Sequence, residues 1–195
     1  AEDWTIYYGN DLPVIQLKDR DNNLAGYYLG IGVDKYGQIV SEDFCKNLSQ
    51  KDASFLEVIE EEISDIAGRY IVILTNPQWE RMYFDPCGTL SAVYDPNTQT
   101  VASSVMLCLD REVKDNPSFD NDAVLSGKEG YFLQNTRDVD VKLIMANHYL
   151  DLKDFSMIRH WPKPDQEFSA NPDEYPEIAA DIDRRLADIF GAIVK

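Results

Sequence analysis

The sequence lacks long hydrophobic runs and is poor in basic residues. No apolar run approaches the roughly 20 residues that a membrane-spanning helix needs, so we expect a soluble protein. Eighteen Lys and Arg stand against 35 Asp and Glu, and the net charge of -17 repels nucleic-acid phosphates and anionic lipid. We therefore expect neither nucleic acid nor a membrane as a partner.

Cysteine is also scarce. The three cysteines cannot all pair within the chain, and their density is far below that of a disulfide-stabilised scaffold. Reduced thiols and a cytoplasmic location are the simplest expectation. The first ten residues, AEDWTIYYGN, contain neither the basic nor the apolar region of a signal peptide, although a signal peptide that had been removed would leave no trace.

Motifs for cofactors and metals are missing too. The sequence GIGVDK (30–35) lacks the third glycine of a dinucleotide-binding turn, and SGK (126–128) lacks the preceding glycine of a P-loop. Zinc needs three or four well-spaced ligands, which two lone histidines and three scattered cysteines do not offer. We predict no cofactor, no metal site and no cofactor-binding residue.

The N-terminal third has the composition of antiparallel strands. A length of 195 residues with 44% hydrophobic content is typical of one globular domain. Aromatic and β-branched stretches predict strands over 4–8, 12–17 and 24–33, with turn residues between the last two.

The turn at 19–23 invites a second interpretation. Asp19, Asp21 and Asn23 have the spacing that opens a calcium loop, but Leu24 stands where that loop needs Gly, and Gly30 where it needs Glu. A hairpin is the favoured interpretation.

A helix is predicted to begin after Ser54. Ser54 and Glu57 have the spacing of a capping box, and Gly68 is expected to end the helix. One helical face carries the apolar residues Phe55, Ile59, Ile63 and Ile66. The carboxylates Glu57, Glu60, Glu61 and Glu62 are interpreted as a solvated face rather than a metal or acid/base site, because nothing nearby in the sequence supplies a histidine or a cation.

The middle of the chain is predicted to be a further strand followed by a meander. The near-continuous apolar run 68–76 is typical of a strand covered on both faces. Two turns, 85–88 and 95–98, are predicted to join three short strands within 80–104.

The C-terminal part begins with a short helical piece around 120–133. Two strands, 141–152 and 156–162, are predicted to follow, joined by a turn at Lys153 and Asp154.

The domain boundaries follow from proline and from one apolar stripe. We expect a domain over 1–162, a Pro-rich linker over 163–175 and an amphipathic helix over 176–195. That helix carries an apolar stripe, which is expected either to contact a following domain or partner, or to pack back onto the core: Ile178, Ile182, Leu186, Ile189 and Ile193.

No side chain is a convincing nucleophile. Cys87 follows Asp85 and has no basic residue closer than Arg81, which disfavours a thiolate. Cys108 is expected to be buried and Cys45 to lie in a polar loop. His148 and His160 are interpreted as hydrogen-bonded sheet residues, and we assign no catalytic residue.

Several segments, taken in order, resemble a known family. DIAGRYIVIL (65–74), MYFDPCGTLSAVYD (82–95), TVASSVMLCL (100–109), and NHYLDL with IRHWP (147–162) resemble NGMFAF, RDPFGxxPLYY, FASExKAL and PGHYLxL with RYW in class II glutamine amidotransferase domains. The likeness is greatest to the N-terminal domain of asparagine synthetases, and it covers residues 54–162.

This resemblance implies an α+β fold, an Ntn-hydrolase-like sandwich of two antiparallel β-sheets flanked by helices. It also implies that Cys87 is a turn residue and that the natural partner is an ATP-pyrophosphatase (synthetase-like) domain, in cis or in trans, because the SGGxDS signature of such a domain is absent here.

The resemblance also implies loss of activity. Family glutaminases use an N-terminal cysteine, whereas this sequence starts with Ala1, and no Arg-Gly or Asn-Gly-Glu segment precedes residue 54. Losing one oxyanion donor alone costs about a hundredfold to a thousandfold in rate. We expect a catalytically inactive domain that serves as a structural or docking module. The alternative is an active amidotransferase or Ntn-type amide hydrolase whose cysteine precedes Ala1, and a third possibility is a binding module for a small amide or amino acid.

Overall fold

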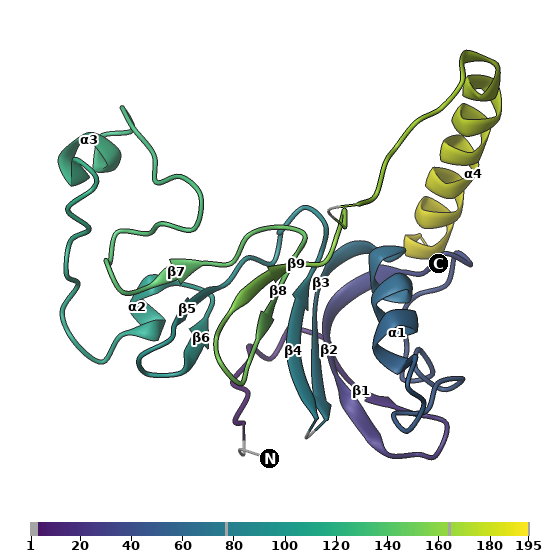
Figure 1. Ribbon diagram of the computed structural model, residues 1–195, viewed down its shortest axis with the longest axis horizontal. Helices are drawn as coiled ribbons and strands as arrows, with labels where there is room; N and C mark the ends of the chain where they lie inside the picture. The colour runs from purple at the N-terminus through teal and green to yellow at the C-terminus, as the bar shows by residue number, and fades with distance from the viewer. Residues whose placement is uncertain (1–3, 77, 164, 195) are drawn as a thin grey trace.

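Two antiparallel β-sheets organise the chain, as the computed structural model shows for residues 4–76, 78–163 and 165–194. The predicted α+β class with two antiparallel sheets is correct (Figure 1). The larger sheet has the strand order β1 (Val14–Lys18), β2 (Leu24–Val33), β3 (Ala67–Asn76), β4 (Trp79–Phe84), β8 (His148–Asp151) and β9 (Met157–Arg159). The smaller sheet has the order β6 (Thr100–Ala102), β5 (Val93–Asp95) and β7 (Lys142–Leu143).

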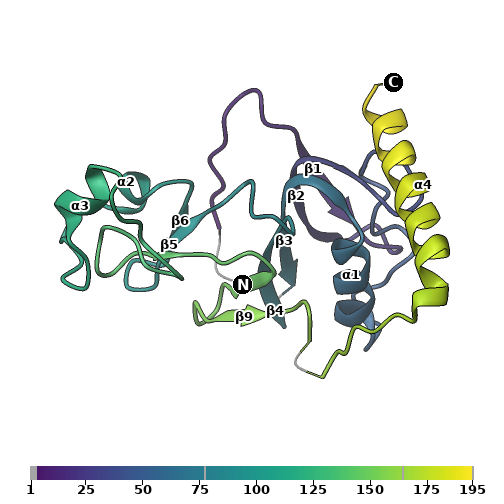
Figure 2. The same ribbon diagram turned by 90° about the horizontal axis from the view of Figure 1, so that it is seen from above.

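Helices lie at both ends of the molecule. Helix α1 lies beside the larger sheet, and α2 and α3 lie with the smaller sheet (Figures 1 and 2). Helix α4 lies at the end of the molecule opposite to α2 and α3. Their bounds are α1 (Phe55–Ser64), α2 (Val105–Cys108), α3 (Asn121–Leu125), the 3-10 turn η1 (Pro172–Glu174) and α4 (Tyr175–Ile193). No helix in the described part of the chain is long and apolar enough to cross a membrane.

The N-terminal hairpin is confirmed, but the strand predicted at 4–8 is wrong. Strands β1 and β2 pair antiparallel, and the Asp19 carboxylate accepts hydrogen bonds from the N–H groups of Asp21 (2.9 Å) and Asn23 (2.8 Å). These bonds close a turn and occupy the carboxylate without a cation. Residues 4–8 form no strand; Trp4 packs on Phe155 while Tyr7 is 92% exposed, so side-chain burial rather than strand pairing holds this segment.

Helix α1 buries the predicted face. Phe55, Ile59 and Ile63 are buried, and so is Ile66 just beyond the helix end. The predicted capping box is wrong, because the Ser54 side chain makes no capping hydrogen bond.

The predicted role of Gly68 is also wrong. Gly68 lies in β3, where an added Cβ would come within 2.3 Å of the Ile31 carbonyl oxygen. The glycine therefore permits close pairing of β3 with β2 rather than ending the helix.

Strand β3 is covered on both faces, as predicted. Tyr70, Val72 and Leu74 belong to the core between the sheet and α1. Ile71 and Ile73 belong to a second core on the other face. A strand buried on both sides has no polar face, which explains its continuous apolar sequence.

The meander predicted over 80–104 is wrong because the chain changes sheets. The turn at 85–88 exists, with the Gly88 N–H donating to the Asp85 carbonyl (2.8 Å). However, β4 pairs with β3 and β8, whereas β5 pairs with β6 and β7. Only the β5–β6 hairpin matches the prediction.

The strand predicted over 141–152 is divided for the same reason. Its first part is β7 in the smaller sheet and its second part is β8 in the larger one. Asn147, with a left-handed φ of 60°, lies just before β8. The predicted β8–β9 hairpin and its turn are confirmed, with the Asp151 N–H donating to the Ser156 carbonyl (2.9 Å).

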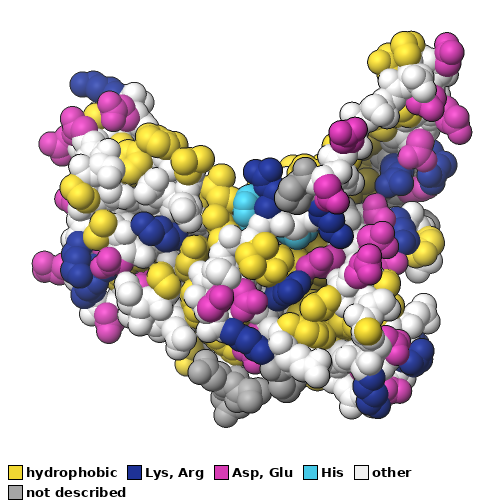
Figure 3. Space-filling view, viewed as in Figure 1, with side chains coloured by type: hydrophobic (Ala, Val, Ile, Leu, Met, Phe, Trp, Pro, Cys, Tyr) yellow, Lys and Arg dark blue, Asp and Glu magenta, His cyan; other side chains and the backbone are white. Residues whose placement is uncertain are grey.

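The last helix extends over nearly the predicted range. Helix α4 follows η1 and leaves much of its apolar stripe exposed. Figure 3 shows hydrophobic side chains along this helix and a hollow between it and the lobe that carries α3. Lys195, at the end of the predicted helix, lies outside the described residues.

Candidate functional site

Two of the three cysteines are buried thiols. Cys108 is 5% exposed, as predicted, and burial raises its pKa to about 11. Cys45 lies in a turn among polar residues, as predicted, but its side chain is fully buried in the core beside α1, and burial raises its pKa to about 12. Neither thiol forms the thiolate that nucleophilic chemistry requires near neutral pH.

Cys87 is exposed and lies in the turn after β4. Its N–H donates to Asp85 Oδ1 (3.1 Å), and in the described part of the chain its sulfur makes no hydrogen bond. The Asp85 carboxylate is fully buried and also accepts hydrogen bonds from the N–H groups of Thr89 and Leu90 and from the Thr89 hydroxyl (2.9 to 3.0 Å). This is the geometry of a structural turn, as the sequence predicted.

Two of the four carboxylates of α1 have cationic partners, so the predicted solvated face is correct only for the other two. Glu60 accepts hydrogen bonds from Arg81 (2.8 Å) and from the Tyr83 hydroxyl (2.8 Å), and Glu62 pairs with Lys35 (2.8 Å). These partners lie on strand β4 and in the loop after β2, 21 or more residues along the chain from the carboxylates they contact, so neighbours in sequence do not reveal them. Glu57 and Glu61 are exposed, as a solvated face requires.

Arg81 and Tyr83 extend this network into an aromatic cluster. The Arg81 guanidinium lies 4.4 Å from the centre of the Tyr149 ring. The His160 ring packs edge-on against Tyr83, with centroids 5.4 Å apart. Strands β4 and β8 and the residue after β9 thus bring Arg, Tyr and His side chains together beside α1.

The two histidines differ. His148 Nδ1 lies 2.9 Å from the Ala146 carbonyl oxygen, as expected for a hydrogen-bonded sheet residue. His160 departs from the prediction: its Nε2 atom is buried and has no hydrogen-bond partner among the described residues. Burial, and then the nearby His148, lower the pKa of His160 to about 4, so the ring is neutral at pH 7.

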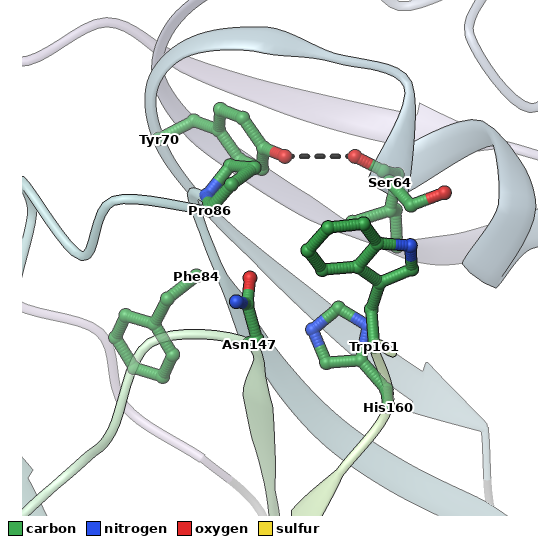
Figure 4. A pocket seen from close by; sticks show the side chains of 8 residues that line it. Ser64, Tyr70, Phe84, Pro86, Asn147, His160 and Trp161 are labelled. Carbon is green, nitrogen blue, oxygen red and sulfur yellow. Dashed lines mark hydrogen bonds between the residues drawn. The ribbon is translucent and has the colours of Figure 1, made fainter. Parts of the chain in front are cut away.

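His160 lines a cavity of about 70 Å³. Figure 4 shows the His160 imidazole and the Asn147 amide projecting into the same space, with Tyr70, Phe84, Pro86 and Trp161 around them. None of the described residues that line the cavity is charged.

Local hydrogen bonds hold this arrangement in place. The Asn147 carbonyl accepts from the His160 N–H (3.0 Å), and the Tyr70 hydroxyl donates to the Ile63 carbonyl (2.8 Å). Of these residues, His160 was recognisable in the sequence as a candidate, whereas Asn147 and Tyr70 were not. A usable signal for Asn147 was an asparagine just before a strand, because asparagine adopts left-handed φ more readily than most residues.

Comparisons with known proteins add no identification: no protein-family model, curated protein or solved structure matches this chain. Within the described residues, no group of three or more His, Cys, Asp or Glu side chains is arranged to hold a metal ion. The cavity at His160 thus offers hydrogen bonding in an uncharged, aromatic surrounding, which suits binding rather than nucleophilic chemistry.

Proposed function

We propose that this chain is a glutaminase-like domain without catalytic activity. In this proposal it docks onto an ATP-using, asparagine-synthetase-like domain, in cis or in trans, and the apolar stripe of α4 contributes to the interface. The exposure of that stripe carries the proposal. Four of its five members are exposed: Ile178 (41%), Ile182 (52%), Leu186 (46%) and Ile193 (60%). Ile189 is only partly exposed, and the neighbouring Phe190 is 64% exposed.

Packing between the two sheets supports the Ntn-hydrolase-like part of the proposal. Leu29 and Ile73 of the larger sheet share one core with Tyr94 of the smaller sheet and with Ile144, which follows β7. Helix α1 covers the opposite face of the larger sheet. A sandwich with helices outside has this layering.

The cysteine environments support the lack of activity. A glutaminase needs an activated nucleophile, and the described thiols are either buried, as at Cys45 and Cys108, or exposed in a structural turn, as at Cys87.

The way α4 lies on the body supports docking. Its attachment includes an ion pair between Arg185 and Asp65 at 3.9 Å, with both side chains well exposed. A contiguous exposed apolar surface is a common feature of interaction sites. Helix α4 therefore combines a large apolar area with weak attachment to its own domain.

Two measurements test the proposal. Ammonia release from glutamine by the purified protein is expected to be absent; release that a cysteine alkylator abolishes would contradict the lack of activity. Binding to a synthetase-type domain is measured by calorimetry with Leu186→Arg, which is expected to weaken it at least tenfold. Ala180→Arg adds the same charge at an exposed site on the other side of α4 and is the control. Equal affinities of the two variants would show that the stripe is not the interface.

A further inference from the structure

We propose that the cavity lined by Tyr70, Asn147, His160 and Trp161 binds a small uncharged primary amide. The starting observation is a mismatch between hydrogen-bonding groups and partners. The buried Nε2 of His160 has no partner among the described residues, and buried polar atoms in native proteins are nearly always satisfied. Either a ligand or an ordered water molecule can satisfy such an atom. The chemistry of the neighbouring groups indicates which of the two it is.

The absence of charge in the lining selects an uncharged ligand. None of the described residues around the cavity carries a charge at neutral pH, and this includes the His160 ring, which is neutral there. An ion that entered would lose its hydration without gaining a counter-charge, which is strongly unfavourable. The net charge of -17 adds further repulsion for an anion.

The hydrogen-bonding groups select a ligand that both donates and accepts. The Asn147 side chain offers an NH₂ donor and a carbonyl acceptor, and a neutral imidazole offers one donor and one acceptor. The Tyr70 hydroxyl already donates to the Ile63 carbonyl and its side chain is fully buried, so Asn147 and His160 supply the hydrogen bonds to the ligand. A primary amide carries the complementary NH₂ and carbonyl groups in one plane.

Size and shape restrict the ligand further. The volume of about 70 Å³ is far below the roughly 300 to 1,000 Å³ of pockets for larger ligands, and the Trp161 indole at the cavity favours a flat molecule. A free amino acid would bring an ammonium and a carboxylate that find no partner here. The inferred site is therefore unsuited to glutamine or asparagine and is independent of the proposed docking function.

The site is held open by the backbone. Asn147 has a left-handed φ of 60°, and its carbonyl is fixed by the His160 N–H (3.0 Å). The β8–β9 pairing, with His148 opposite Arg159, keeps Asn147, just before β8, beside His160, just after β9. Both side chains thus face the cavity without a ligand to arrange them.

The test uses acetamide as the probe and the two histidines as reporters. Acetamide is titrated into ¹⁵N-labelled protein while ring nitrogens are followed by long-range ¹H–¹⁵N correlation. We expect saturable shifts of the His160 ring nitrogens with a Kd of roughly millimolar size, as suits so small a ligand, and no saturable shift at His148. Acetate has the same shape but a charge and no NH₂ group, so it is expected to produce no saturable shift.

Glycine substitutions supply the matched variants. Asn147→Gly removes the amide but keeps the left-handed backbone accessible, and is expected to weaken acetamide binding at least tenfold. Asn22→Gly makes the same change at a left-handed residue (φ 61°) in the β1–β2 turn, and is expected to leave the affinity unchanged. The backbone amide spectrum of each variant verifies the fold.

Three results would overturn the inference. The first is a linear, non-saturating response at both histidines, which would leave ordered water as the occupant. The second is equal binding of acetate and acetamide. The third is unchanged affinity in a folded Asn147→Gly variant.

Discussion

Replacing His160 with phenylalanine should remove an acid-sensitive contribution to the free energy of unfolding. Burial lowers the pKa of His160 from its ordinary value of 6.5 to about 4 in the folded protein. Between these two values the unfolded chain binds more protons than the folded chain, so the free energy of unfolding falls as the pH falls from 6.5 to 4. Above pH 7 both states hold a neutral ring and the effect is absent.

The size of the effect follows from the pKa difference. Each pKa unit corresponds to about 1.4 kcal/mol, which would give about 3 kcal/mol if the ring were fully shielded from solvent. His160 is only partly buried as a residue, so solvent screening reduces the expected loss to about 2 kcal/mol. The phenylalanine ring can keep the edge-on contact with Tyr83 and has no proton to gain.

Urea denaturation at pH 7.5, 6.0, 5.0 and 4.5, followed by circular dichroism, measures the effect. Many carboxylates titrate in the same range, so the decisive quantity is the difference in unfolding free energy between wild type and His160→Phe at each pH. That difference should shift by about 2 kcal/mol in favour of the variant between pH 7.5 and 4.5. A His160→Phe difference that is the same at every pH would refute the reasoning.

Three further predictions concern stability at neutral pH, each measured by urea denaturation. Asp85→Ala should cost about 3 kcal/mol or more, because it leaves several turn N–H groups without their charged acceptor; a loss below 1 kcal/mol would show that solvent replaces it. Glu60→Gln should cost about 1 to 2 kcal/mol through its partly buried partners, whereas Glu61→Gln should change stability by less than about 0.5 kcal/mol; equal effects would mean that the ion pair adds nothing. Ile63→Ala should cost about 2 to 5 kcal/mol, whereas Ile182→Ala should stay within about 0.5 kcal/mol, and a large loss at Ile182 would place the α4 stripe in the core.

Much of the local structure was predictable because its causes lie within a few residues. The turn at Asp19 is closed by N–H groups two and four residues away. The buried face of α1 follows from apolar residues that repeat every three or four positions. The two-sided burial of β3 appears directly as a continuous apolar run.

The errors have a different origin. The predicted capping box at Ser54 is wrong because the spacing of Ser54 and Glu57 permits the capping hydrogen bonds without requiring them. The predicted meander is wrong because the residues of a turn are the same whether the next strand pairs with the preceding one or joins another sheet. The burial of Cys45 was missed because polar neighbours in sequence do not reveal a side chain that points into the core.

The candidate site was only half accessible to sequence reasoning. His160 could be named as one of two histidines, but strands β4 and β8 and the end of α1 decide that its buried Nε2 finds no partner among the described residues. The only indication for Asn147 was that an asparagine just before a strand favours a left-handed backbone. Nothing near it in the sequence indicates a cavity.

The sequence by itself determined the elements: the charge, the hairpin turns, the apolar faces of α1 and α4, and the buried run of β3. Only the tertiary structure decided which strands share a sheet, that Arg81 meets Glu60 across 21 residues, and that His160 faces Asn147 over a small cavity. The physical reason is range. Side-chain periodicity and turn hydrogen bonds act over a few residues, whereas sheet partners and desolvated ion pairs depend on which distant segments exclude water together.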